Sequence, residues 1–183
     1  MRESGSREES MANISIRPAM PQDVRLILTF IHELATYEKL AHEVVATEGD
    51  MHAALFGERP VVETVIASLD AEPVGYALYF PTFSTFLGKP GLYLEDLYVR
   101  PAARGFGVGR KLLEHLARIT VERGWGRLEW SVLDWNEPSI AFYTKMGARP
   151  MDEWTVFRLT GADLETLAVA DSKIRGLSDS DNP

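Results

Sequence analysis

Apolar residues recur along the chain at two spacings, one typical of helices and one typical of strands. Between residues 24 and 35 they fall three or four positions apart, which predicts an amphipathic helix that opens at residues 21–23. The tetrapeptide TEGD at 47–50 resembles a capping box and predicts the start of a second helix. The helical spacing returns over residues 108–123, which Gly124 ends. A shorter helix is predicted over residues 136–147, with Asn136 as its cap.

Strands are predicted where apolar residues alternate with polar ones or where β-branched and aromatic residues cluster. The segments are 13–19, 61–69, 73–80, 91–99, 127–134 and 153–159. The short turn DAE joins the second and third of them into a hairpin, and residues 81–90 are expected to form a loop. The order β-α-α-β-β-β-α-β-α-β predicts a mixed sheet with helices on both faces, and not a purely parallel βαβ winding.

The two ends of the chain look different from the middle. Residues 1–12 are polar and are expected to be disordered, with Met11 as an alternative start, and residues 171–183 are expected to form a flexible tail. This leaves one domain over residues 13–170, which agrees with a total length of 183 residues.

Composition narrows the function classes. The chain has no cysteine, which excludes disulfides and a thiolate nucleophile. It has no apolar run of membrane-spanning length and no signal-peptide pattern, so a soluble cytoplasmic protein without a membrane partner is expected. The net charge of −8 argues against nucleic acid as the main partner. It is compatible with a cationic ligand, although solubility alone explains it equally simply.

Histidine and tryptophan residues give no sign of a cofactor site. The four histidines lack metal-ligand spacing, so no metal is expected, and the tryptophans at 130, 135 and 154 are expected to lie in the core.

Three alternating glycines lie between the predicted strand 91–99 and the helix 108–123, in the segment RGFGVGR at 104–110. Glycines at a helix N-terminus let an anion, most often a phosphate, approach the unpaired N–H groups. The spacing does not fit a P-loop or a dinucleotide-binding fingerprint. A tight strand-to-helix turn without a ligand is the structural alternative.

Residues 104–109 resemble the pyrophosphate loop of the GNAT superfamily of N-acetyltransferases, which bind acetyl-CoA. The stretches YLEDLYV (93–99), DWNEPSIAFYTKMGA (134–148) and ELATYEKL (33–40) with FGERP (56–60) are similar to the diamine, or spermidine/spermine, N-acetyltransferase subfamily. The similarity covers most of residues 13–169.

The resemblance implies an α/β fold of three layers, α-β-α, with a mixed and largely antiparallel central sheet. Strands 91–99 and 127–134 would splay apart and hold the pantetheine arm between them. It also implies a homodimer and acetyl-CoA as co-substrate, with no metal.

The same resemblance assigns residues to the cofactor. The backbone of Leu97, Tyr98 and Val99 would pair with the pantetheine arm and polarise the thioester carbonyl. The pyrophosphate would be held by Arg104, Gly105, Phe106, Gly107, Val108, Gly109 and Arg110. Asn136 and Ser139 would contact CoA from the other side.

Tyr143 occupies the family's position for the general acid that protonates the CoA thiolate. A packed helix tyrosine beside Ile140 and Met146 is the structural alternative. No nucleophile–base pair stands out, so a covalent acyl-enzyme is not expected.

Two carboxylates, Glu95 and Asp96, interrupt an otherwise apolar strand, and alternation is expected to place them on opposite faces. By resemblance, Glu95 faces the substrate amine, binds the ammonium and helps to remove its proton. Asp96 is assigned to substrate binding, with a structural cap or salt bridge as the alternative. Tyr37 and Glu38 would line the far end of the amine channel, within reach of the partner subunit.

One departure from the subfamily concerns substrate length. Polyamine-acetylating members tend to have an acid at the position of Ser84 and a tryptophan at the position of Phe86. This favours a short diamine or a lysine-like amino acid over a long polyamine. The predicted function is therefore acetyl transfer from acetyl-CoA to a primary amine of a small molecule, by direct attack in a ternary complex. A protein or peptide N-acetyltransferase and a non-catalytic CoA-binding domain are the alternatives.

Overall fold

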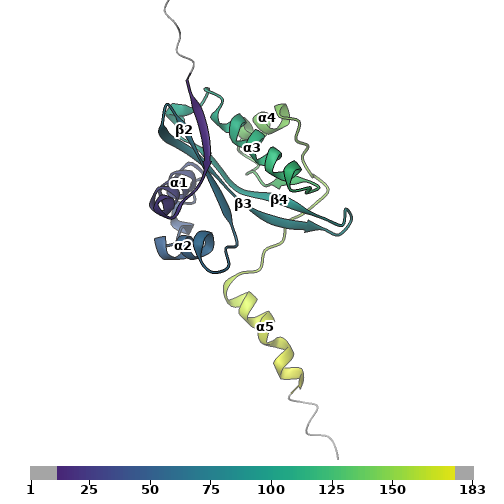
Figure 1. Cartoon of the computed structure of the whole chain (residues 1–183). Coiled ribbons are helices and arrows are strands. Elements are labelled where there is room, and N and C mark those ends of the chain that lie inside the picture. The colour runs from purple at the N-terminus through teal and green to yellow at the C-terminus, as the bar shows by residue number, and fades with distance from the viewer. Residues whose placement is uncertain (1–11, 176–183) are drawn as a thin grey trace, which may run out of the picture. The chain divides into compact units, whose positions relative to one another are not determined.

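The computed structural model describes residues 12–175, and the side chains of residues 12–169. The predicted tails at residues 1–11 and 176–183 lie outside the described residues. The chain forms two compact units, the first ending at Ile140 and the second beginning at Ala141 (Figure 1).

A five-stranded sheet forms the centre of the first unit, with its strands in sequence order. The strands are β1 (Ile14–Pro18), β2 (Glu63–Leu69), β3 (Glu72–Ser84), β4 (Lys89–Val99) and β5 (Leu128–Trp130). The first four pair antiparallel, and β5 pairs parallel with β4. This is the mixed, largely antiparallel sheet that the sequence predicts.

Helices cover both faces of this sheet. The first unit contains α1 (Val24–Tyr37), α2 (Glu48–Phe56), α3 (Val108–Glu122) and three short 3-10 turns, Pro21–Asp23, Ala41–Glu43 and Pro101–Ala103. Helices α1 and α2 lie on one face and α3 on the other (Figure 1). The three-layer α/β architecture is therefore confirmed. The capping box at Thr47 is confirmed as well, because the Asp50 N–H donates to Thr47 Oγ1 over 3.2 Å and the Thr47 N–H donates to an Asp50 carboxylate oxygen.

The core between the sheet and α1 and α2 is built from the apolar stripe that the helical spacing predicts. Its buried members are Val24, Ile27, Phe30, Met51, Leu55, Ile66, Tyr76, Leu78 and Tyr98. The rings of Phe30 and Tyr76 stack with their centroids 5.5 Å apart. Burying one large apolar side chain of this kind stabilises a fold by roughly 1.5–3 kcal/mol, so this layer holds α1 firmly against β3 and β4.

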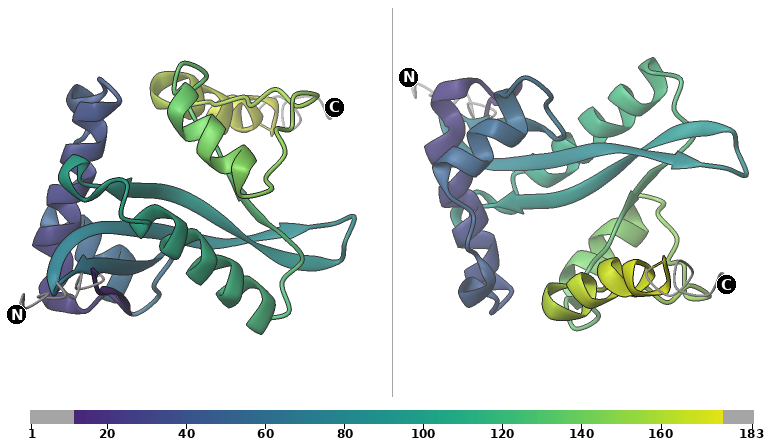
Figure 2. Two further views of the ribbon diagram at one scale, coloured as in Figure 1. Left: turned by 90° about the horizontal axis from the view of Figure 1, so that it is seen from above. Right: turned by 90° about the horizontal axis from the view of Figure 1, so that it is seen from below.

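The segment predicted as a loop, residues 81–90, is largely strand. Residues 81–84 continue β3, and residues 89–90 begin β4, so only the short turn around Phe86 is irregular. The end of this hairpin projects away from α1 and α2 (Figure 2). The prediction of a loop over 81–90 is therefore wrong, because the ladder between β3 and β4 extends to the pair Ser84 and Lys89.

The second unit contains the end of α4 (Glu137–Lys145), an irregular segment and α5 (Gly161–Arg175). The strand predicted at 153–159 does not form, and its apolar side chains Trp154, Val156 and Phe157 are exposed. A strand needs a hydrogen-bonding neighbour, and side-chain alternation does not reveal whether the fold provides one. Helix α5 continues through residue 175, five residues into the segment predicted as a flexible tail.

Two of the predicted core tryptophans are also exposed. Trp135 is 50% exposed and Trp154 is 69% exposed, whereas Trp130 is half-buried. Their placement in the core was wrong, because β5 ends at Trp130 instead of continuing to residue 134 and the strand predicted at 153–159 does not form.

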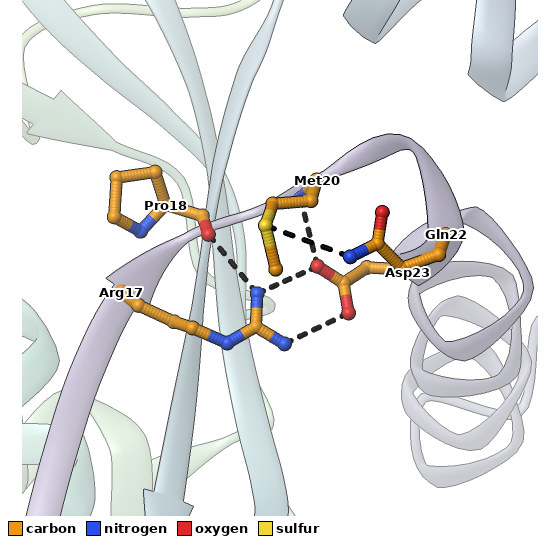
Figure 3. Close-up of polar contacts among 5 residues, drawn as sticks. All are labelled: Arg17, Pro18, Met20, Gln22 and Asp23. Carbon is orange, nitrogen blue, oxygen red and sulfur yellow. Dashed lines mark hydrogen bonds and ion pairs between the residues drawn. The ribbon is translucent and has the colours of Figure 1, made fainter.

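A partly buried ion pair fixes the passage from β1 to α1. Asp23 is buried, and its carboxylate accepts from the Arg17 guanidinium over 2.6 and 2.8 Å and from the Met20 N–H over 2.7 Å (Figure 3). The hydrogen bond from Arg17 lowers the pKa of Asp23. The polar contacts of this junction orient the first turn of α1 on the sheet.

Replacing Asp23 by Asn is expected to lower the free energy of unfolding by on the order of 2 kcal/mol at neutral pH, because the buried side chain at position 23 loses the charge that attracts the Arg17 guanidinium. The pKa of Asp23 is depressed in the folded state, so its stabilisation is present above the pKa of the unfolded chain and is lost as pH falls through the folded value. The deficit should therefore shrink in acid. Urea unfolding at several pH values measures it.

The matched control is Glu48→Gln, which alters an exposed ion pair with Arg25. It should change the free energy of unfolding by well under 1 kcal/mol. Equal effects of the two substitutions would show that the Arg17–Asp23 pair does not hold this junction.

Candidate active site

Strand β4 separates from β5 in the middle of its length. Residues 92–94 of β4 pair with residues 128–130 of β5. Among the residues that the structure describes, this pairing ends at Leu94, opposite Trp130. Strand β4 nevertheless continues to Val99, paired with β3 on its other side. The backbone of residues 95–99 therefore has a free edge toward β5, which is the splay that the resemblance implies.

A β-bulge lies at the same point. Tyr79 pairs with Leu94 and Leu78 pairs with Asp96, so Glu95 is an extra residue in β4. The prediction that alternation places Glu95 and Asp96 on opposite faces assumed a regular strand, and the bulge interrupts that regularity. The pairing with Leu78 puts Asp96 on the face of the sheet that α1 and α2 cover.

Three carboxylates act on one buried hydroxyl at this bulge. The Tyr76 hydroxyl donates to Asp96 Oδ2 over 2.7 Å. Burial raises the pKa of Tyr76 well above 10, and the negative charges of Asp96, Glu38 and Glu95 raise it further. The fold thus brings the predicted substrate residues Glu38, Glu95 and Asp96 into electrostatic range of each other.

Two carboxyl groups of this cluster, those of Glu38 and Asp96, have raised pKa values. Burial raises the pKa of Asp96, and the hydrogen bond from Tyr76 opposes the rise. Burial also raises the pKa of Glu38, at the C-terminal end of α1, and the charge of Asp96 adds to the effect. A bound cation would relieve both effects, because an opposite charge favours the ionised carboxylates.

The glycine segment forms a turn that leads into α3. Gly105 and Gly107 have φ angles of 86° and 91°, and Gly107 is the N-cap of α3. A Cβ at either position would meet nothing within 4 Å. Glycine is therefore required here by the left-handed backbone, and open space lies in front of the turn.

The N-terminus of α3 offers backbone donors beside this open space. The first N–H group of the helix bonded to the preceding turn is that of Lys111, which donates to the Gly107 carbonyl over 3.0 Å. The N–H groups of Val108, Gly109 and Arg110 precede it and have no intrahelical partner. Together with the partial positive charge of the helix end, they form an anion-binding arrangement.

The two arginines of the segment lie differently. Arg104 Nε donates to the Val99 carbonyl over 3.0 Å, and its guanidinium lies 4.9 Å from the centroid of the Tyr37 ring and 6.0 Å from that of Tyr98. Arg110 is exposed and pairs with Glu114 on the same helix, where Nε and Oε1 are 2.8 Å apart. Phe106, between the glycines, is 56% exposed.

A pocket of about 510 Å³ lies between α1 and the end of β4. It is lined by Thr29, His32, Glu33, Thr36, Tyr37, Tyr98, Pro101 and Arg104. Behind it, the Arg100 guanidinium donates to both carboxylate oxygens of Glu33 and packs 4.8 Å from the Phe30 ring centroid. This ion pair joins α1 to the end of β4, so the pocket wall is anchored from both elements.

Asn136 connects α1 to the start of α4. Its side chain is 5% exposed, and Oδ1 accepts from the Tyr37 hydroxyl over 3.1 Å and from the Ser139 N–H over 3.4 Å. The Tyr37 ring also lies 6.0 Å from the Trp135 ring. The structure therefore groups Tyr37 with the predicted cofactor residues Arg104, Asn136 and Ser139, while Glu38 next to it turns to the carboxylate cluster.

Tyr143 lies in α4, in the part that belongs to the second unit. Its side chain is half-buried, and its ring lies 5.3 Å from that of Phe142. Its carbonyl accepts the N–H groups of Met146 and Ala148, which end the helix. These contacts fix the backbone at this position, and the role of Tyr143 as general acid stays a prediction.

The sequence did not indicate that Tyr76 and Trp135 contact the predicted site residues Asp96 and Tyr37. Tyr76 lies in an apolar run where a tyrosine is read as ordinary core, and only the pairing of β3 with β4 brings its hydroxyl to Asp96. Trp135 directly precedes the predicted cap residue Asn136 in the stretch DWNEPSIAFYTKMGA. This position was the one feature of the sequence that could have pointed to it.

No group of His, Asp or Glu side chains among residues 12–169 is arranged to hold a metal ion. No helix in the part of the chain that the structure describes is long and apolar enough to cross a membrane.

Comparison with known proteins identifies the family. Residues 29–148 match the model of the acetyltransferase (GNAT) family. The chain belongs to this family. The prediction of a GNAT acetyltransferase is therefore confirmed, and enzymes of this family use acetyl-CoA.

The relatives add detail on likeness within the family. A thialysine N-epsilon-acetyltransferase of Sus scrofa is 37% identical over 169 residues, which cover 86% of this chain and 99% of the relative. An L-ornithine N5-acetyltransferase of Arabidopsis thaliana is 32% identical, over 83% of this chain and 86% of the relative. A spermidine/spermine N(1)-acetyltransferase-like protein of Homo sapiens is 33% identical over 90% of this chain, but only 25% of its own length is covered.

Solved structures agree with the fold. An integron cassette protein of V. cholerae superposes with a TM-score of 0.71 at 28% identity, over 85% of this chain and 97% of the other. An aminoglycoside acetyltransferase from a soil metagenome superposes with a TM-score of 0.65 at 17% identity, over 81% and 95%, which shows likeness of fold alone.

Proposed function

We propose that this acetyltransferase moves the acetyl group of acetyl-CoA to a side-chain amine of a small, lysine- or ornithine-like amino acid. The observation that carries the proposal is the cluster of Glu38, Glu95 and Asp96 at the point where β4 leaves β5. A carboxylate cluster in which the pKa values of Glu38 and Asp96 are raised, beside a free strand edge, suits a cationic amine that must meet a thioester.

The free edge of β4 and the N-terminus of α3 fit acetyl-CoA. The edge of Leu97, Tyr98 and Val99 that β5 does not pair would bind the pantetheine arm, and an N–H group on that edge would polarise the thioester carbonyl. The turn from Arg104 to Arg110 would hold the pyrophosphate with its backbone N–H groups. Bound there, acetyl-CoA supplies an activated acetyl group.

The arginine and asparagine contacts modify this assignment. Arg104 already bonds the Val99 carbonyl and packs on Tyr37, so it would orient the wall of the cofactor site as well as contribute charge. Asn136 and Ser139 would support CoA through the cap of α4, which Tyr37 braces.

The carboxylates would accept a proton from the amine, and Tyr143 would donate one to the thiolate. Glu38 and Asp96 would bind the ammonium, and Glu95 would accept the proton that the amine loses, directly or through water. The amine nitrogen then forms a bond to the carbonyl carbon as the carbon–sulfur bond breaks. Tyr143 would donate a proton to the departing thiolate, so that charge does not accumulate on sulfur.

The turn at Ser84 supports a short substrate. Ser84 is 5% exposed, and its hydroxyl accepts from the Leu87 N–H over 3.3 Å, so it caps the hairpin turn. It does not provide the anchoring acid expected for the distal amine of a polyamine. The relatives that match over nearly their whole length are named for thialysine and ornithine, which supports an amino acid substrate.

A homodimer, expected from the resemblance, and a cytoplasmic location, expected from the sequence pattern, form part of the proposal. The exposed apolar side chains of residues 154–159 support an assembly, because such side chains commonly mark interfaces.

The test of the proposed function is release of free thiol from acetyl-CoA across a panel of thialysine, lysine, ornithine, putrescine, spermidine and a lysine-containing peptide. We expect the highest kcat/KM on the amino acids. Preference for spermidine would show that a serine at position 84, in place of an acid, does not limit substrate length. Preference for the peptide would support the protein acetyltransferase alternative, and no turnover on any amine would contradict the proposal.

Gly107→Ala is expected to weaken acetyl-CoA binding at least tenfold, because an alanine does not readily adopt φ near 90° and the N–H groups of the turn would move. Gly124→Ala is the matched control, since Gly124 also has a positive φ and open space around it but follows the other end of α3. Both variants should lose on the order of 1 kcal/mol of stability. Calorimetric titration with acetyl-CoA separates them, and equal affinities would place the pyrophosphate elsewhere.

Tyr143→Phe is expected to lower kcat by on the order of 100-fold or more while the dissociation constant of acetyl-CoA stays within twofold, because only proton donation to the thiolate is removed. Steady-state kinetics with the best amine of the panel, together with acetyl-CoA titration, provides both values. A kcat equal to that of the unmodified enzyme would leave Tyr143 with the packing role alone.

A further inference from the structure

We propose that Tyr76 is a positioning residue for the amine: its buried hydroxyl holds Oδ2 of Asp96 and thereby orients the other carboxylate oxygen toward the substrate ammonium. The inference rests on the proposed function, since it assumes that Asp96 binds the amine. It assigns a role to a fully buried residue of strand β3 that contacts the predicted substrate residue Asp96 from the core.

The surroundings of Tyr76 make its hydroxyl a fixed donor. The residue has no exposed surface, and its ring stacks on Phe30 with an interplanar angle of 8°. Pairing with Tyr98 across the ladder between β3 and β4 fixes its backbone. A ring held in this way has no alternative position within the core, so the hydroxyl stays 2.7 Å from Asp96 Oδ2.

Packing alone does not account for the hydroxyl. A phenylalanine would fill the same space and stack on Phe30 equally well, whereas a buried hydroxyl costs free energy unless it is hydrogen-bonded. The partner here is itself a carboxylate that burial destabilises. A pair of apolar residues would be the simpler solution for stability, so the polar pair indicates a function.

The charges that face this pair explain why a donor is useful. Glu38 reaches it from the end of α1, Glu95 and Asp96 from β4, and Tyr76 from β3. Burial raises the pKa of Glu38 and of Asp96, and the charge of Asp96 raises the pKa of Glu38 further. Tyr76 stabilises the ionised form of Asp96 and is not deprotonated in the working pH range, because its own pKa lies well above 10. It thus keeps Asp96 charged before the amine arrives.

The test is Tyr76→Phe, which removes one oxygen and keeps the ring. We expect KM for the amine to rise between tenfold and a hundredfold, the effect of one hydrogen bond to a charged group. The acid limb of kcat/KM for the amine should move to higher pH, because the lost hydrogen bond had favoured the carboxylate and its pKa therefore rises. The dissociation constant of acetyl-CoA should not change.

Tyr79→Phe is the matched control on the same strand. Tyr79 is also buried, and its hydroxyl donates over 3.3 Å to Glu63, a carboxylate that Arg123 at the end of α3 neutralises. The two substitutions remove the same chemical group from the same kind of bond. Tyr79→Phe should leave the amine KM and the pH profile unchanged, whatever its effect on the melting temperature.

A double-mutant cycle with Asp96→Asn separates positioning from folding. If Tyr76 acts through Asp96, Tyr76→Phe should have little further effect on amine KM once Asp96 is Asn. Independent, additive losses would overturn the proposal. So would an unchanged amine KM and pH profile in Tyr76→Phe, or a loss of kcat alone that tracks a lowered melting temperature.

Calorimetric binding of the amine distinguishes this inference from the proposed function. If the unmodified protein neither binds nor acetylates any amine of the panel, the proposed function fails and the role of Tyr76 fails with it. If the unmodified protein does both and Tyr76→Phe binds the amine with the same affinity, only the role of Tyr76 is wrong. A weakened affinity in Tyr76→Phe but not in Tyr79→Phe supports both.

Discussion

Strand β4 pairs with β3 over most of its length but with β5 only as far as Leu94, and the geometry of the candidate site depends on that difference. A strand with one free edge exposes backbone donors and acceptors that an extended ligand can bind. The bulge at Glu95 lies at the same place and brings two consecutive carboxylates to the start of the free edge. One irregularity in the sheet therefore creates both halves of the site.

Opposite charges are arranged at the two ends of this free edge. The carboxylates of Glu38, Glu95 and Asp96 gather at its beginning, and the helix N-terminus after Gly107 lies beyond its end. In the proposed function, an ammonium and a pyrophosphate would thus be attracted to separate places on one protein. The separation matters because the amine has to reach the thioester carbonyl without binding to the phosphates.

Helix α1 contacts both the strand that carries the carboxylates and the segment that leads to α4. Its buried face packs on β3 and β4 through Phe30 and Tyr76, and Glu33 anchors Arg100 just after β4. Tyr37, near its C-terminal end, reaches Asn136 at the start of α4. The helix that begins after the Arg17–Asp23 ion pair therefore carries the packing of Phe30, the ion pair of Glu33 and the hydrogen bond of Tyr37 on successive turns.

The sequence by itself determined the local structure and the family. Apolar spacing placed α1, α3 and the hairpin of β2 and β3, because such patterns depend on near neighbours in the chain. The glycine motif at 105–109 identified the turn, since only glycine adopts its positive φ angles readily. Tertiary structure alone decided where β4 loses its partner, that residues 153–159 do not form a strand, and that Tyr76 reaches Asp96. Each of these depends on which segments lie side by side, and hydrogen-bond partners distant in sequence leave no local pattern.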